Sequence, residues 1–173
     1  MRIMVTGHRP QKLSYGDEGK IRAHMNAFLC RAIKKHGAEN LIIISGMALG
    51  VDTWWFQEAA DFGLAIHAYI PFQGQEAAWK PKQREDYRSY LYWLSVRDEK
   101  HKIITVCSPG FAAWKMQKRN EAMVDNSDVC VAYWNGTSGG TANCVEYAEP
   151  RIWLCKIDSK DWNTESWTKP SEA

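Results

Sequence analysis

The sequence predicts a single-domain α/β fold, a three-layer sandwich in which a mostly parallel sheet carries helices on both faces. Short apolar runs alternate with segments of helical periodicity, which is the pattern of strand–helix–strand units. Three of these runs end in glycine-rich turns, as strands of open parallel sheets often do beside a ligand. The 173 residues, with 45% hydrophobic content, suffice for one well-filled core and are few for two.

Six apolar runs are the expected strands, at residues 2–6, 41–45, 65–70, 102–107, 128–134 and 152–157. Apolar residues recur at helical spacing in Asp17–His36, and Gly37 supplies a C-cap. Further helices are expected at residues 51–62, 82–96, 111–125 and 144–148. The connection from 71 to 100 is too long for a turn, which is why a helix is placed inside it. We assign the domain to residues 1–157 and a polar tail to 158–173.

Charge and composition limit the possible partners. The 22 basic and 20 acidic residues give a formal net charge of +2 without a long single-sign block, so a nucleic-acid partner is disfavoured without being ruled out. No apolar run approaches the ~18 residues of a membrane span, and no secretion signal is evident, so we expect a cytoplasmic protein without a membrane partner. The five cysteines are expected to be mostly buried free thiols. No residue cluster indicates a metal, and no cofactor is expected.

The three glycine-rich turns carry the candidate ligand-binding residues. A glycine lets the backbone approach an anion closely, and a following helix start supplies free N–H groups. Any one such turn is equally well explained by chain conformation alone, but all three would lie at the same edge of the sheet. The candidates from these turns are Gly7, His8, Arg9, Ser45, Gly46, Gly50, Asp52, Gly136, Ser138, Gly139, Gly140 and Thr141.

Two of these candidates have alternative interpretations. Arg9 can grip a phosphate with two hydrogen bonds, or it can pair with a surface carboxylate. Asp52 can accept hydrogen bonds from ribose hydroxyls, or it can cap a helix in its first turn, and the sequence favours neither.

The ordered motifs resemble a known superfamily. Thr6-Gly-His-Arg-Pro10, Ser45-Gly-Met-Ala-Leu-Gly-Val-Asp52, the Arg119-Asn120 pair and Gly139-Gly-Thr141 are similar to the YpsA-like branch of the SLOG superfamily of Rossmann-like domains. That superfamily includes the DNA-processing protein DprA (Smf) and the LOG phosphoribohydrolases. The resemblance spans residues 4 to about 148, and it implies nucleotide-type binding with Arg119 and Asn120 as ligand contacts.

The LOG pattern also implies a catalytic arginine and glutamate, which would be Arg119 and a glutamate three residues after Thr141. This sequence has Cys144 there, and its nearest carboxylate is Glu146. A shift of two residues on a helix turns a side chain by about 200° to the opposite face. Arg119 and Glu146 are therefore the catalytic candidates only if the protein is an enzyme, with Asp52 or Asp125 as substitutes for the glutamate.

Two functions follow. The first is binding of a nucleotide or a nucleotide-derived, ADP-ribose-like ligand at the carboxyl edge of the sheet, and the second is N-glycoside hydrolysis of nucleoside 5′-monophosphates. A homodimer or higher homo-oligomer is also expected, because large aromatic residues exceed what one core of this size needs. These residues are Trp54, Trp55, Tyr90, Trp93 and Trp114.

Overall fold

The computed structural model describes residues 1–171 and shows one mostly parallel sheet between two helical layers. The strands are β1 (Arg2–Gly7), β2 (Ile42–Ser45), β3 (Ala65–Ile70), β4 (Lys102–Thr105), β5 (Val129–Tyr133), β6 (Trp153–Ile157) and β7 (Glu165–Thr168). The helices are α1 (Asp17–His36), α2 (Val51–Asp61), α3 (Pro81–Val96), α4 (Ala113–Asp125) and α5 (Gly140–Ala148), with short 3-10 turns at Pro10–Lys12 and Ala38–Asn40. The strand order is β4-β3-β2-β1-β5-β6-β7, and the β6–β7 pair alone is antiparallel within these residues.

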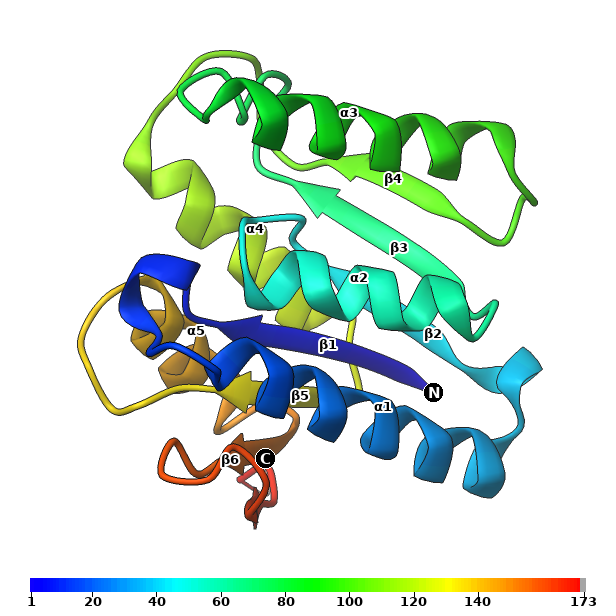
Figure 1. Ribbon diagram of the computed structural model, residues 1–173, viewed down its shortest axis with the longest axis vertical. Coiled ribbons are helices and arrows are strands. Elements are labelled where there is room, and N and C mark those ends of the chain that lie inside the picture. The colour runs from blue at the N-terminus through cyan, green and yellow to red at the C-terminus, as the bar shows by residue number, and fades with distance from the viewer. Residues whose placement is uncertain (172–173) are drawn as a thin grey trace.

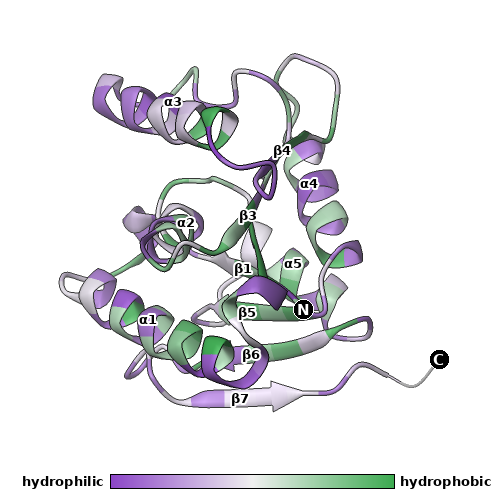
Figure 2. Ribbon diagram, turned by 90° about the vertical axis from the view of Figure 1, so that its right-hand side faces the viewer, coloured by the Kyte–Doolittle hydropathy of each residue, from purple (hydrophilic) through white to green (hydrophobic). Residues whose placement is uncertain are grey.

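The helices divide between the two faces of the sheet. Figures 1 and 2 show α1, α2 and α3 on one face and α4 and α5 on the other. Alternating residues of the central strand β1 pack into the two cores on either face of the sheet, because successive strand side chains point in opposite directions. Ile3 and Val5 belong to the core under α1 and α2, and Met4 belongs to the core under α4 and α5. The predicted α/β sandwich is confirmed.

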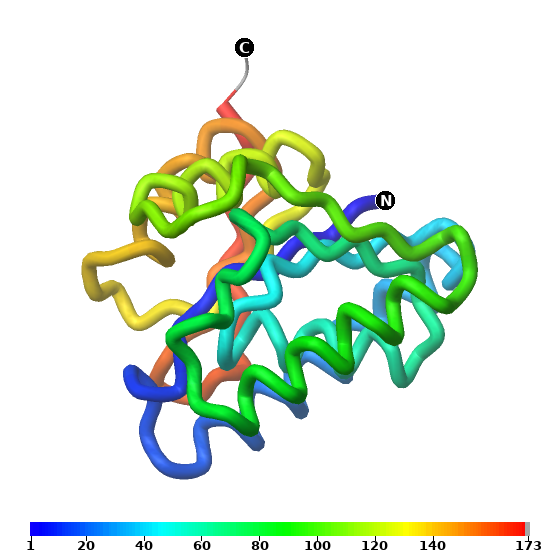
Figure 3. The backbone as a smooth tube through the Cα atoms, turned by 90° about the horizontal axis from the view of Figure 1, so that it is seen from above, coloured from blue at the N-terminus to red at the C-terminus, as the bar shows by residue number. Residues whose placement is uncertain are grey.

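The sheet reverses its order at β1. The chain builds outward from β1 through β2, β3 and β4, and then returns to place β5 on the opposite side of β1. At such a switch point, the two connections that leave the carboxyl ends of neighbouring strands diverge and open a crevice. Figure 3 shows the connections after β1 (blue) and β5 (yellow) at one end of the molecule, and the Val51 amide, directly after the turn that follows β2, donates to the carbonyl of His8 after β1. The topology therefore brings the three predicted glycine-rich turns to a common edge.

The C-terminal segment departs from the expectation of a polar tail. Glu165–Thr168 forms β7 beside β6, and Trp162 is buried in the core. Phe28 of α1 stacks on Trp167, and buried His24 of α1 contacts Glu165 through Nε2 at 3.1 Å. Residues 172–173 of the expected tail lie outside the described residues.

Most expected element boundaries hold within two residues. The expected strand at 102–107 is shorter and ends at Thr105. The helix expected to begin at residue 82 starts one residue earlier, because Pro81 suits the first helical position and the Gln83 side chain accepts a hydrogen bond from the Lys80 amide. None of the helices within residues 1–171 combines the length and the apolar character that crossing a membrane requires.

The aromatic residues divide between the core and the surface. Trp55 is fully buried and Trp54 nearly so, while Tyr90 and Trp93 pack on the edge of the same core. Trp114 is exposed. Four of the five residues behind the expected homo-oligomer are therefore already used in folding the monomer.

Candidate functional site

A cavity of about 430 Å³ opens where the connections after β1 and β5 diverge. Eight of the predicted site residues line it: Gly7, His8, Arg9, Asp52, Arg119, Asn120, Gly140 and Thr141. The lining carries three cationic side chains, those of Arg9, Lys12 and Arg119, against one carboxylate, that of Asp52. A cavity with this balance attracts anions.

Gly7 lets the first helix after β2 approach the end of β1. A Cβ at Gly7 would lie 2.5 Å from a methyl carbon of Val51, so a larger residue would push α2 away. The Val51 amide also donates to the His8 carbonyl at 3.4 Å. This packing fixes the turn that carries His8 and Arg9 into the cavity.

His8 joins the turn after β1 to the loop after β5. It is 2% exposed, and its Nε2 lies 2.7 Å from Oδ1 of Asn135. The same Asn135 oxygen accepts from the amide and hydroxyl of Thr137, at 3.1 and 2.7 Å. Burial lowers the pKa of His8, opposed by the hydrogen bond to Asn135, so the side chain is neutral at neutral pH. His8 thus holds the glycine-rich loop in place rather than adding a charge.

The first turn of α5 presents free backbone donors at the mouth of the cavity. Its N-cap is Gly139, and the first amide to bond within the helix is that of Asn143, which donates to Gly139 at 3.0 Å. The amides of Gly140, Thr141 and Ala142 have no acceptor among residues 1–171. Free N–H groups and the positive end of the helix dipole together favour a bound anion.

One contact holds this helix start against the end of β1, and a second holds the preceding loop against the turn after β1. The Thr141 hydroxyl donates to the Gly7 carbonyl at 3.1 Å, and Lys12 Nζ donates to the Ser138 carbonyl at 3.2 Å. Lys12 was not among the predicted site residues. The signal that could have found it is the turn begun by Pro10, which brings Lys12 back beside Arg9.

Arg119 and Asp52 form a buried pair in the cavity wall. Nη1 of Arg119 lies 3.5 Å from Oδ2 of Asp52 and also donates to the Gly46 carbonyl, while Nε donates to Oδ1 of Asn120 at 2.9 Å. Each side chain of the ion pair is at most 10% exposed. A Cβ at Gly46 would overlap the guanidinium, which explains a glycine at this position.

The environment of Asp52 shifts its protonation. Burial raises the pKa of Asp52, and the Arg119 guanidinium, the Ala48 amide and Arg9 oppose the shift. The Ala48 amide donates to Oδ2 at 3.4 Å, and the Ser45 hydroxyl donates to the Asp52 carbonyl at 2.7 Å. Asp52 lies in the first turn of α2, which begins after Gly50 without a side-chain cap, and it lines the cavity. A contact of Asp52 with ribose hydroxyls stays a prediction.

The remaining predicted residues lie outside the lining. Ser45, Gly46, Gly50, Gly136, Ser138 and Gly139 shape the surrounding turns. Glu146 is exposed near the end of α5, and Asp125 is exposed and accepts from the Tyr147 hydroxyl at 3.1 Å. Of the carboxylates considered as a catalytic group, Asp52 lines the cavity and the other two do not. No group of three potential metal ligands occurs in residues 1–171.

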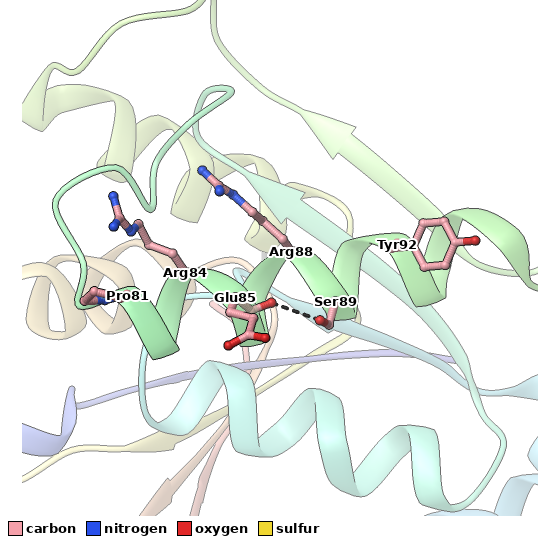
Figure 4. Close-up of a pocket in the computed structure, with 6 residues that line it drawn as sticks. All are labelled: Pro81, Arg84, Glu85, Arg88, Ser89 and Tyr92. Carbon is pink, nitrogen blue, oxygen red and sulfur yellow. Dashed lines mark hydrogen bonds between the residues drawn. The ribbon is translucent and has the colours of Figure 1, made fainter.

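A larger hollow of about 560 Å³ lies on the outer surface of α3. Figure 4 shows its lining side chains, which come from this one helix, and the hydrogen bond from the Ser89 hydroxyl to the Glu85 carbonyl. Within residues 1–171, every residue that lines this hollow belongs to α3, so no second element closes it. The cavity at the switch point, where three connections converge, is therefore the candidate site.

The cysteines do not form a site with these groups. Cys130, Cys144 and Cys155 are buried, Cys107 is partly buried and Cys30 is exposed, and all five are free thiols. Cys144, at the position of the glutamate expected from the LOG pattern, points into the core beside Cys130 and Thr6.

Comparison with known proteins shows the family of the chain and proteins that share its fold. The model of the YpsA family, described as the YspA SLOG family, matches residues 3–149. The uncharacterized SPbeta prophage-derived protein YoqJ of Bacillus subtilis is 35% identical over 124 residues, which cover 61% of this chain and 68% of YoqJ.

Two solved structures of DNA processing protein A share the fold. The protein from Streptococcus pneumoniae aligns with a TM-score of 0.64 at 16% identity, covering 90% of this chain and 50% of that one. The protein from Helicobacter pylori, whose structure concerns a single-stranded DNA binding mode, aligns with a TM-score of 0.63 at 13% identity, covering 92% and 69%. This chain thus spans half the length of the pneumococcal protein.

Proposed function

The chain belongs to the YpsA family of SLOG proteins, and we propose that it binds a nucleotide or a nucleotide-derived, ADP-ribose-like ligand in the cavity at the switch point. The observation that carries the proposal is the start of α5. Three amides there have no acceptor among residues 1–171, and two of their residues, Gly140 and Thr141, line a cavity that Arg9, Lys12 and Arg119 make basic. A phosphate group satisfies the free donors and the local charge together.

The other groups of the cavity suit the sugar portion of such a ligand. Asp52 and Asn120 line the same cavity, and their side chains can hydrogen-bond hydroxyl groups. The volume of about 430 Å³ falls in the range of ordinary small-molecule sites. The formal charge of the lining favours a ligand with one or two phosphates.

The ligand class is tested by calorimetric titration of the purified chain with inorganic phosphate, AMP, ADP-ribose and a short single-stranded DNA. We expect saturable binding of a mononucleotide or ADP-ribose that is tighter than that of phosphate. Binding of DNA alone would instead place this chain's function with polynucleotides. Absence of binding by all four would contradict the proposal.

A second candidate function is hydrolysis of an N-glycosidic bond, and the observation that favours it is Asp52 beside Arg119 in the cavity. Cleavage requires a carboxylate near the anomeric carbon that can stabilise positive charge or activate water. Asp52 meets the requirement of position, whereas exposed Glu146 does not line the cavity. Oδ2 of Asp52 already contacts Arg119 and accepts from the Ala48 amide, which leaves less of the carboxylate for a ligand, so we expect binding without strong turnover.

This alternative is tested by incubating the chain with AMP, CMP, GMP and UMP and following the free base by chromatography. We expect no release at rates near the usual ~1 to 1000 per second. Release that is lost in Asp52→Asn and kept in Glu146→Gln would establish hydrolysis with Asp52 as the catalytic residue. If release of the free base is lost only in Glu146→Gln, the catalytic role belongs to Glu146.

A further inference from the structure

A second cavity of about 230 Å³ lies beside the first, separated from it by two segments in contact, Pro10 after β1 and Gly50 before α2. Both residues line the second cavity, while His8 and Arg9 line the first. The partition is thin, because a Cβ at Gly50 would lie 2.8 Å from both the His8 carbonyl oxygen and Cδ of Pro10. The two cavities are thus neighbours with separate walls.

The second cavity is aromatic and acidic. Its side chains come from α1, α2, α3 and the segment before α3, and those that matter here are Glu18, Trp54, Trp79, Asp86, Tyr87 and Tyr90. No lysine or arginine lines it within residues 1–171. The two carboxylates therefore give it a charge opposite to that of the first cavity.

The polar ends of the two tyrosines are already engaged by the protein. The Tyr87 hydroxyl accepts from Gln75 at 2.9 Å, and the Tyr90 hydroxyl accepts from Gln57 at 2.7 Å. Trp79 meets Tyr87 edge to face, with ring centres 5.2 Å apart. These contacts fix the rings in place, so the cavity offers a ligand preset aromatic surfaces.

The carboxylates remain available to a ligand. Glu18 makes no ion pair within residues 1–171, and Asp86 pairs with Lys82 at 2.7 Å. The Lys82 side chain is 77% exposed, and such surface pairs hold their partners weakly. A cation in the cavity can therefore face both carboxylates.

We propose that this second cavity binds an organic cation, an alkylammonium or guanidinium group, between its aromatic rings and the carboxylates of Glu18 and Asp86. The negative faces of tryptophan and tyrosine rings attract such cations, most strongly where water is displaced. A compact head group fits the small volume, whereas a nucleotide phosphate meets only negative charge here. This inference does not depend on the ligand of the first cavity.

The purified chain is titrated with choline, with methylguanidinium and with 3,3-dimethylbutan-1-ol, the neutral isostere of choline. Binding is measured by calorimetry and by the shift of the NMR signals of the tryptophan indoles. We expect saturable binding of at least one of the two cations, with the neutral isostere about tenfold weaker or more. Absence of saturation by both cations, or equal binding of choline and its isostere, would overturn the proposal.

Variants locate the site. Glu18→Gln and Trp79→Leu are each expected to weaken cation binding severalfold, while Glu99→Gln, at an exposed carboxylate after α3 that lines neither cavity, serves as the control. Glu18 is exposed, so its variant keeps the test valid if Trp79→Leu unfolds. Unchanged cation affinity in both site variants would place binding elsewhere and contradict the proposal. Phosphate titration of the same variants shows whether the first cavity is intact.

Discussion

The guanidinium of Arg119 and the carboxylate of Asp52 lie 3.5 Å apart in the wall of the basic cavity, both nearly excluded from solvent. The pair joins α4 to the start of α2, which pack on opposite faces of the sheet. The Arg119 guanidinium reaches Asp52 past Gly46, where the absence of a Cβ leaves room for it. Breaking such a pair on one side leaves a buried charge without its partner.

Gly46→Ala is expected to displace Arg119, because the new Cβ would overlap its guanidinium. We expect a loss of about 1–3 kcal/mol in the free energy of unfolding, the usual cost of overpacking, together with weaker nucleotide binding. Urea unfolding and calorimetry measure the two effects. Gly19→Ala, where nothing lies within 4 Å of the added Cβ, is the control, and equal stability of both variants would refute this role of Gly46.

Asp52→Asn is expected to change the dependence of stability on pH. Burial raises the pKa of Asp52 in the folded state, so the folded protein binds more protons than the unfolded chain from about pH 4 upward. The contribution of Asp52 to stability therefore falls as pH rises from its unfolded pKa through its folded pKa. The difference in stability between the variant and the wild type should therefore shift in favour of the variant as pH rises above about 4, whatever the constant cost of losing the pair with Arg119. Urea unfolding at several pH values measures this difference. If the stability of the variant instead falls relative to the wild type as pH rises, the pKa of Asp52 is lowered in the folded state, which contradicts the prediction.

The oligomeric state is open to a direct measurement. Phe111, Tyr92 and Trp114 are 78%, 69% and 59% exposed, and exposed aromatic residues are common at partner surfaces. We expect light scattering to give about twice the 19.8 kDa mass of the chain at micromolar concentration. A monomer mass across that range would contradict the expectation.

The sequence predicts the edge at which the site forms but not how its side chains pair. Glycine turns after β1, β2 and β5 are local signals, and their convergence follows from parallel strand order. The Asp52–Arg119 pair is a contact between distant segments that depends on the missing side chain of Gly46. No local pattern encodes it.

The last strand shows a second limit of prediction. The segment Glu165–Thr168 is short, lies at the sheet edge and has only one apolar residue, Trp167, so period-two alternation cannot identify it. What holds it is tertiary, namely the contacts of Glu165 with His24 and of Trp167 with Phe28. The position of Cys144, in contrast, follows from helical phase alone, which points it into the core.

The measurement that tests phosphate recognition at the start of α5 most directly compares Gly140→Val with Gly19→Val. Both glycines lie in the first turn of a helix, and an added Cβ meets nothing within 4 Å at either position, so neither variant should disturb the fold. The Gly140 variant places a branched side chain at the mouth of the cavity, beside the free amides. We predict that calorimetry shows nucleotide binding lost in Gly140→Val and kept in Gly19→Val. Unchanged affinity in a folded Gly140→Val protein would contradict the account.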